Sequence, residues 1–170
     1  MNAIKSAHTD LARPKLLVLG ATGATGRLIV KDALARGFEV RTLVRSREKA
    51  GGLEGAEIVV GDARNEAALR EALAGTDAVV SALGTPVSPF REVTVLSSAT
   101  KALVAAMKAA GVSRLVCITG IGAGDSAGHG GFVFDRLILP ALLRKVYADK
   151  NRQEAIVQTA GEDIATSPCA

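Results

Sequence analysis

Short apolar runs separated by helical patterns organise the chain. Short, mainly apolar runs lie at residues 16–19, 57–60, 77–83 and 114–119, and residues 39–44 add a run of β-favouring residues in which Val40, Thr42 and Val44 share one face. Runs of this length are typical of strands that are buried on both faces, as in a parallel sheet. Elsewhere apolar residues recur every three or four positions, which predicts helices over about 26–36, 66–74, 96–111 and 145–160. The alternation predicts an α/β fold, a doubly wound parallel sheet of about five strands in the order 3-2-1-4-5.

Three glycines end the first apolar run. In KLLVLGATGATG, residues 15–26, they lead from the strand directly into the first helix. Such a turn lets a phosphate approach the main chain, and the free N–H groups of the helix then face an anion. The pattern predicts a Rossmann-like nucleotide site, with an ordinary tight strand-to-helix connection as the alternative. The predicted cofactor-binding residues of this glycine turn are Gly20, Ala21, Thr22, Gly23, Ala24, Thr25 and Gly26.

Basic residues follow the second predicted strand. Folds that prefer NAD place an acidic residue there to hold the ribose 2′-OH, whereas this chain has Arg45, Arg47 and Lys49, with Arg41 in the same cluster. A guanidinium can bind phosphate oxygens through two hydrogen bonds, so Arg45 is the best candidate for the 2′-phosphate of NADP(H). The alternative is a solvated basic turn without a ligand.

The ends of two further strands carry candidate residues. Asp62 follows the third strand, where it could accept a hydrogen bond from an adenine amino group. Capping of the next helix explains Asp62 equally well. After the fourth strand, Gly84 and Thr85 leave an open backbone for a ligand.

Composition and charge limit the classes of function. A chain of 170 residues with 48% hydrophobic residues predicts one domain over 14–170, preceded by a flexible tail over 1–13. A net charge of +4 and 3% aromatic residues argue against a nucleic-acid-binding protein. Cys117 and Cys169 are too few for a disulfide framework or a metal site, which favours a reducing cytoplasm. No apolar run approaches the roughly 20 residues that cross a membrane, and the first 15 residues do not look like a signal peptide.

A glycine-rich stretch follows the fifth predicted strand. Residues 120–131 hold six of the glycines and predict a mobile loop. His129 in this loop could donate a proton, but an exposed histidine of this kind usually has no chemical role. The apolar stretch over 132–143 is too short to span a bilayer and suggests a pocket wall or a contact between subunits.

Five motifs together resemble a known family. GATGATG, LVRSREK, VVGD, AVVSALGT and RLVCITGIGAGD are similar to motifs of the atypical short-chain dehydrogenase/reductases, in the NAD(P)-binding NmrA-like and flavin-reductase (biliverdin reductase B-like) group. The resemblance covers about residues 14–160. It implies NADP(H) with its pyrophosphate on the glycine turn and its 2′-phosphate at Arg45 and Lys49. The remaining contacts that it implies are Asp62 and Ala63 at the adenine, Leu83, Gly84 and Thr85 at the ribose next to the nicotinamide, and Thr119 under the nicotinamide ring.

Catalytic residues follow less directly from this resemblance. Short-chain dehydrogenases use a Tyr-x-x-x-Lys pair to exchange a proton with the substrate. Tyr147 and Lys150 are separated by only two residues, so they share a helical face but depart from the motif. With Thr119 they are the candidate catalytic residues. The implied function is hydride transfer from NADPH to a small conjugated, flavin-like or quinone-like acceptor, with an NADP(H)-sensing module and a sugar epimerase as alternatives.

The end of the chain departs from the family pattern. GEDIATSPCA shows little strand signal beyond Ile164, where similar chains continue with a further strand. We therefore expect a shortened carboxyl-terminal part and an exposed edge on the fifth strand. Such an edge would favour self-association into a homo-oligomer.

Overall fold

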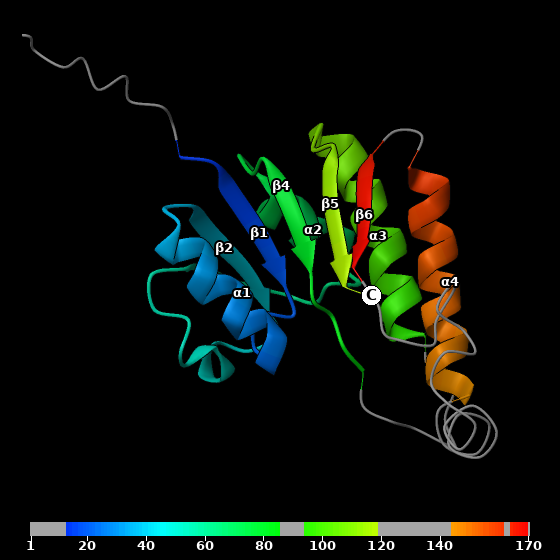
Figure 1. Ribbon diagram of the computed structural model, residues 1–170, viewed down its shortest axis with the longest axis horizontal. Helices are drawn as coiled ribbons and strands as arrows, with labels where there is room; N and C mark the ends of the chain where they lie inside the picture. Colours follow the sequence, from blue (N-terminus) through cyan, green and yellow to red (C-terminus); the bar gives the residue numbers. More distant parts are fainter. Residues whose placement is uncertain (1–12, 86–93, 119–143, 162–163, 170) are drawn as a thin grey trace, which may run out of the picture.

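A parallel sheet with the strand order β3-β2-β1-β4-β5-β6 forms the centre of the structure (Figure 1). The computed structural model describes residues 13–85, 94–118, 144–161 and 164–169. The strands are β1 Lys15–Leu19, β2 Glu39–Val44, β3 Glu57–Val60, β4 Ala78–Ser81, β5 Arg114–Ile118 and β6 Ala165–Cys169. The helices are α1 Ala24–Ala35, the short 3-10 helix η1 Arg47–Ala50, α2 Glu66–Leu73, α3 Val95–Ala110 and α4 Arg144–Ala160.

Helices cover both faces of the sheet. Leu17 and Leu19 of β1 are fully buried in a cluster with residues of α2, α3 and α4, whereas Val18 between them is buried with residues of α1. Alternate side chains of one strand thus enter two different cores, which is why the apolar runs are nearly continuous. The predicted α/β fold and the order 3-2-1-4-5 are confirmed.

The expectations that the chain has little strand structure after Ile164 and that the fifth strand has an exposed edge are wrong. Residues 165–169 form β6, which pairs in parallel with β5 from Arg114↔Ala165 to Ile118↔Cys169. Ile164, directly before β6, is 2% exposed and belongs to the same core as α2, α3 and α4. The fifth strand therefore has a neighbour on its outer side and no exposed edge there (Figure 1). An edge strand tolerates small polar residues and proline, so its sequence carries a weak strand signal.

A buried carboxylate joins α3 to α4. Asp149 of α4 has no exposed surface and accepts hydrogen bonds from the backbone N–H groups of Leu96, at 2.8 Å, and Ser97, at 3.3 Å. The Ser97 hydroxyl also donates to Asp149. The residue before α3, Thr94, provides no side-chain cap. A side chain of α4 thus caps the amino end of α3.

Candidate functional site

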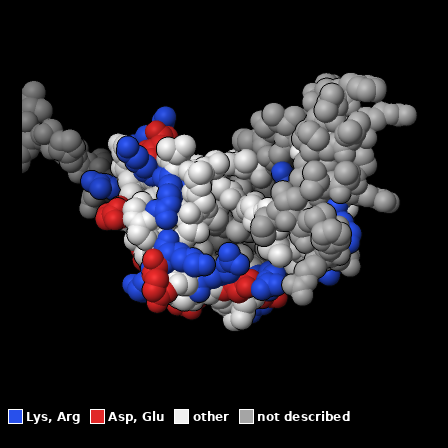
Figure 2. Space-filling view, turned by 90° about the horizontal axis from the view of Figure 1, so that it is seen from below, with Lys and Arg blue, Asp and Glu red and all other residues white. Residues whose placement is uncertain are grey.

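The carboxyl ends of β1, β2, β3 and β4 meet at one edge of the sheet, which we call the carboxyl edge. The chain leaves β1 for α1 on one face and leaves β4 toward α3 on the other face. In doubly wound sheets, ligands bind where neighbouring strands diverge in this way. Figure 2 views the molecule from this edge and shows lysine and arginine side chains gathered in a band over part of it.

Two glycines of the glycine turn are required by close packing. Gly20 has a φ of +76°, and a Cβ there would lie 2.6 Å from the carbonyl carbon of Ala82, at the end of β4. At Gly26 a Cβ would lie 2.7 Å from the Cα of Ala21. Neither position has space for a side chain, so the turn lies tightly between β4 and α1.

Gly23 differs from these two glycines. It is exposed, and the nearest atom that a Cβ would meet is the carbonyl oxygen of Gly20, at 3.3 Å. Gly23 is the N-cap residue of α1, with a φ of −78°, and no side chain caps this helix end. The first N–H groups of α1 have no partner within the helix, and the first turn holds no acidic residue. This surface of the turn is therefore suited to an anion.

The remaining residues of the turn divide between core and surface. Ala21 is 1% exposed and packs in the core beneath α1, so its backbone alone is available to a ligand. Thr22, Ala24 and Thr25 are exposed at the start of the helix.

The segment that follows β2, residues 45–52, carries the predicted phosphate ligands, and we call it the basic segment. Arg45 and Lys49 are exposed, and within the described residues no hydrogen bond or ion pair occupies either side chain. Arg47 differs, since its guanidinium lies 3.5 Å from the carbonyl oxygen of Ile58. Two cations that make no hydrogen bond or ion pair with any described residue thus lie beyond the end of β2, next to the end of β3.

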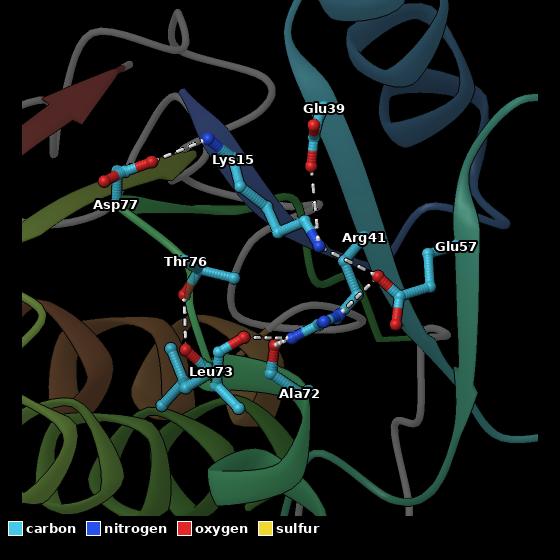
Figure 3. Close-up of polar contacts among 9 residues, drawn as sticks. Lys15, Glu39, Arg41, Glu57, Ala72, Leu73, Thr76 and Asp77 are labelled. Carbon is cyan, nitrogen blue, oxygen red and sulfur yellow. Dashed lines mark hydrogen bonds and ion pairs between the residues drawn. The ribbon is translucent and has the colours of Figure 1, made fainter. Parts of the chain in front are cut away.

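Arg41 does not belong to this site, although it belongs to the same basic cluster in the sequence. It is 9% exposed on β2, and its guanidinium donates to the carbonyl oxygens of Ala72 and Ala74, at 3.0 and 2.5 Å, at the carboxyl end of α2. Its Nε lies 2.9 Å from a carboxylate oxygen of Glu57 (Figure 3). Arg41 holds α2 against the sheet, so the sequence cluster contains a structural residue.

Arg27 is a residue of this edge that sequence reasoning missed. Its Nε donates to the carbonyl oxygen of Thr22, at 3.3 Å, and its two terminal nitrogens donate to the carbonyl oxygens of Lys49, at 3.3 Å, and Gly51. It therefore connects the glycine turn to the basic segment. A signal was present in the sequence, because a cation near the start of a helix opposes the helix dipole and needs a partner elsewhere.

Asp62 lies after β3, close to Arg45. Its carboxylate accepts hydrogen bonds from the backbone N–H and the guanidinium of Arg64, at 2.6 to 2.9 Å. These bonds, with a smaller contribution from the charge of Arg45, lower the pKa of Asp62 to about 2. The N-cap of α2 is Asn65, which accepts from the N–H groups of Ala67 and Ala68. The alternative that Asp62 caps this helix is therefore wrong.

The other predicted contacts at this edge have different exposures. Ala63 and Leu83 are half-buried and pack against the core on the side of α2 and α3. Gly84 is exposed, and a Cβ there would meet no atom within 4 Å. Thr85 is half-buried. The backbone after β4 is thus open at Gly84, next to the tight contact with Gly20.

Two of the three candidate catalytic residues lie in the described part of the chain. Tyr147 and Lys150 are half-buried on α4, and the Lys150 ammonium lies 5.4 Å from the centre of the Tyr147 ring. The two side chains share a helical face, as their spacing predicts. Burial lowers the pKa of Lys150, and the charge of Glu154 opposes this effect. Thr119 and His129 lie outside the described residues, as does the stretch over 132–143.

A separate groove of about 640 Å³ lies between α3 and α4. Its lining includes Lys101, Val104, Arg152 and Ile156 and contains none of the candidate residues. Among the described residues, no group of three or more His, Cys, Asp or Glu side chains could hold a metal ion. No helix in the described part of the chain is long and apolar enough to cross a membrane.

The comparison with known families agrees with this geometry. A family model described as NAD(P)H-binding matches residues 20–164, from the glycine turn to the start of β6. The chain belongs to this NAD(P)H-binding family. The resemblance predicted from the five motifs is therefore confirmed at the level of the family, and the cofactor class is a nicotinamide dinucleotide.

Named relatives of this NAD(P)H-binding chain differ in their described roles. Photosystem II assembly factor Ycf39 of Guillardia theta is 40% identical over 104 residues, which are 59% of this chain and 33% of that protein. A 4-hydroxy-2-methyl-3-oxo-4-farnesyl-3,4-dihydroquinoline-1-oxide ketoreductase of Stigmatella aurantiaca is 33% identical over 113 residues, which are 62% of this chain and 33% of that protein. The chain thus spans about a third of the length of both relatives.

Among solved structures, ChuY, an anaerobillin reductase from Escherichia coli O157:H7, is similar with a TM-score of 0.72. The match covers 91% of this chain and 70% of ChuY at 22% identity. At this identity the similarity shows the shared Rossmann-like fold.

Proposed function

We propose that the protein is an NADPH-dependent oxidoreductase that transfers hydride to a small conjugated, flavin-like or quinone-like acceptor. The observation that supports it best is the combination of an open Gly23 surface with Arg45 and Lys49 on the neighbouring segment, two cations that make no hydrogen bond or ion pair within the described part of the chain. An acidic residue in place of Arg45 would have favoured NAD(H), and would also have suited an epimerase.

The proposed binding mode uses the chain's own donors. The pyrophosphate would lie on the first turn of α1, over Gly23 and the hydroxyl groups of Thr22 and Thr25. The 2′-phosphate would lie between Arg45 and Lys49. Asp62 and Ala63 would border the adenine, and Leu83, Gly84 and Thr85 would border the second ribose.

The proposed chemistry is a hydride transfer coupled to a proton transfer. When bound, NADPH would supply the hydride. Lys150, whose pKa is lowered by burial, and Tyr147 would hold or donate the proton that completes reduction of the acceptor. Thr119 is proposed to lie under the nicotinamide. We propose the cytoplasm as the compartment, where the buried thiol of Cys117 stays reduced.

A second candidate is a module that senses NADPH without turnover. Two observations favour it, namely the shortened spacing of Tyr147 and Lys150 and the similarity to Ycf39, which is described as an assembly factor. A sensor would bind NADPH and present the bound state to a partner protein.

Steady-state NADPH oxidation distinguishes the two candidates. We would titrate NADPH and NADH into the full chain by fluorescence and then measure turnover with menadione and with FMN as acceptors. Turnover that Thr119→Ala or Lys150→Ala abolishes, with NADPH affinity retained, supports the enzyme. Tight NADPH binding without turnover supports the sensor, and a preference for NADH contradicts both.

A further inference from the structure

Three carbonyl oxygens from two segments converge on the guanidinium of Arg27. One belongs to Thr22 in the glycine turn, and the other two belong to Lys49 and Gly51 in the basic segment. The basic segment otherwise consists of the short helix η1 and turns, held by hydrogen bonds such as Lys49 N–H to Ser46 and Leu53 N–H to Ala50. Arg27 therefore ties this segment to the rest of the site from outside.

The chemistry of these contacts suits an arginine. The carbonyl groups at the end of a helix lack partners within it, and Lys49 and Gly51 lie at the end of η1. A planar guanidinium presents five N–H donors in a fixed fork, so it can serve several carbonyl groups at once. Gly52 makes room for it, because a Cβ there would lie 2.5 Å from a terminal nitrogen of Arg27. Gly52 also has a φ of +80°, which favours glycine.

Another arginine, the residue that follows the last residue of the same helix, has no such role. Arg36 makes an ion pair with Asp32 on the helix surface, at 2.7 Å, and both side chains are more than 60% exposed. Arg36 and Arg27 carry the same charge, but Arg27 alone of these two contacts the basic segment. Arg36 is therefore a matched control for any effect of charge alone.

We propose that Arg27 is a positioning residue that determines cofactor specificity. It fastens the basic segment to the glycine turn and so holds Arg45 and Lys49 at the distance from the pyrophosphate site that a 2′-phosphate requires. The inference rests on the proposed function for its ligand, NADPH. The anchoring itself does not depend on a ligand, because the contacts of Arg27 are with the protein backbone.

The anchoring is tested first in the protein without cofactor. Trypsin cleaves after lysine and arginine, and Arg45, Arg47 and Lys49 are its sites within the basic segment. In Arg27→Ala and Arg27→Lys, we expect cleavage in this segment to be roughly 5- to 20-fold faster than in the wild type. Arg36→Ala should be cleaved at the wild-type rate. Mass spectrometry identifies the bond that is cut, and the melting temperature shows that each variant is folded.

Cofactor discrimination is tested second, by titration of NADPH and NADH into the same variants. We expect Arg27→Ala to reduce the preference for NADPH over NADH by about 5- to 10-fold, with Arg36→Ala unchanged. Arg27→Lys keeps the charge but replaces the fork by one ammonium group, so it should behave more like Arg27→Ala than like the wild type.

Three results would overturn the proposal. Wild-type cleavage rates in Arg27→Ala would show that the segment is not anchored there. Equal losses of affinity for NADPH and NADH, with unchanged cleavage, would mean that Arg27 contacts the shared pyrophosphate directly. A wild-type preference for NADPH over NADH in Arg27→Lys would show that only the positive charge of Arg27 matters. Failure of the proposed function can be told apart from failure of this proposal. In the former case the wild type would not prefer NADPH, but the trypsin cleavage rates would still show whether Arg27 holds the basic segment.

Discussion

The carboxylate of Asp149 on α4 accepts a hydrogen bond from the backbone N–H of Leu96 on α3, at a distance of 2.8 Å. The contact spans 53 positions of sequence. Because Asp149 is fully buried, its carboxylate needs hydrogen-bond donors, and the N–H groups at the start of α3 need an acceptor. Each helix therefore provides the partners that the other lacks.

Replacement of Asp149 should therefore destabilise the fold. Asp149→Ala leaves the amino end of α3 without its cap, and we expect a loss of about 2 kcal/mol in the free energy of unfolding. Asp149→Asn keeps one acceptor oxygen and should lose less. Urea unfolding followed by circular dichroism measures both. Thr94→Ala is the control, since the Thr94 side chain makes no capping bond, and equal losses in Thr94→Ala and Asp149→Ala would contradict the assignment.

Gly23→Val should abolish binding of both NADPH and NADH while the fold survives. The side chain would project from an exposed position with an ordinary φ into the space proposed for the pyrophosphate. Gly26→Ala should instead destabilise the protein, because its Cβ would collide with the backbone of Ala21. Thermal unfolding and cofactor titration on each variant separate the two effects. Unchanged affinity in folded Gly23→Val would place the phosphates elsewhere.

Arg45→Ala should weaken NADPH binding by roughly 10- to 150-fold, since charge-assisted hydrogen bonds contribute about 1.5–3 kcal/mol each. NADH binding should barely change. Arg47→Ala is the matched control on the same segment, because the Arg47 guanidinium lies near the carbonyl oxygen of Ile58. Isothermal titration with both cofactors checks this, and a similar loss for NADH would refute the 2′-phosphate assignment.

The acid sensitivity of the protein should depend in part on Asp62. Its pKa is about 2 in the folded protein and about 4 in an unfolded chain, so its contribution to stability is present above about pH 4 and is lost as the pH falls toward 2. Asp62→Asn should therefore lose less stability than the wild type between pH 5 and pH 2. Arg64→Ala should raise the pKa of Asp62, which carboxyl NMR titration would detect. A pKa of Asp62 that stays near 2 in Arg64→Ala would show that Arg64 is not the cause.

Much of the fold could be predicted because four of the first five strands are short, mainly apolar runs and the other, β2, consists largely of β-favouring residues. The burial of Leu17, Val18 and Leu19 on alternating faces is the physical reason for such a run. The sixth strand could not be predicted in this way, since its residues include Pro168 and it pairs, among the described strands, with β5 alone. Ile164, which is buried in the core directly before this strand, is the one residue there whose type predicted a strand.

The site could be predicted where a residue type is tied to a backbone geometry. Gly20 and Gly26 occupy positions where a side chain does not fit, so their spacing was informative. The direction in which a side chain points could not be predicted from the sequence in the same way. Arg41 and Arg45 are close in sequence, yet one contacts the carboxyl end of α2 and the other is exposed at the carboxyl edge. The role of Arg27 depends on contacts with Lys49 and Gly51, which are 22 and 24 positions away in the sequence.

The place of β1 between β2 and β4 has a consequence for how the protein folds. β1, β2 and β3 pair within one continuous stretch of chain. By contrast, β1 meets the segment before β4 through a hydrogen bond from the N–H of Lys15 to the carboxylate of Asp77, which is 62 positions away in the sequence. Pairings that close long loops cost more chain entropy and tend to form late. The turn at Gly20 reaches its tight contact with Ala82 only when β4 has docked. The tight turn that the proposed nucleotide site needs is thus complete only after the slow, long-range pairing of β1 with β4.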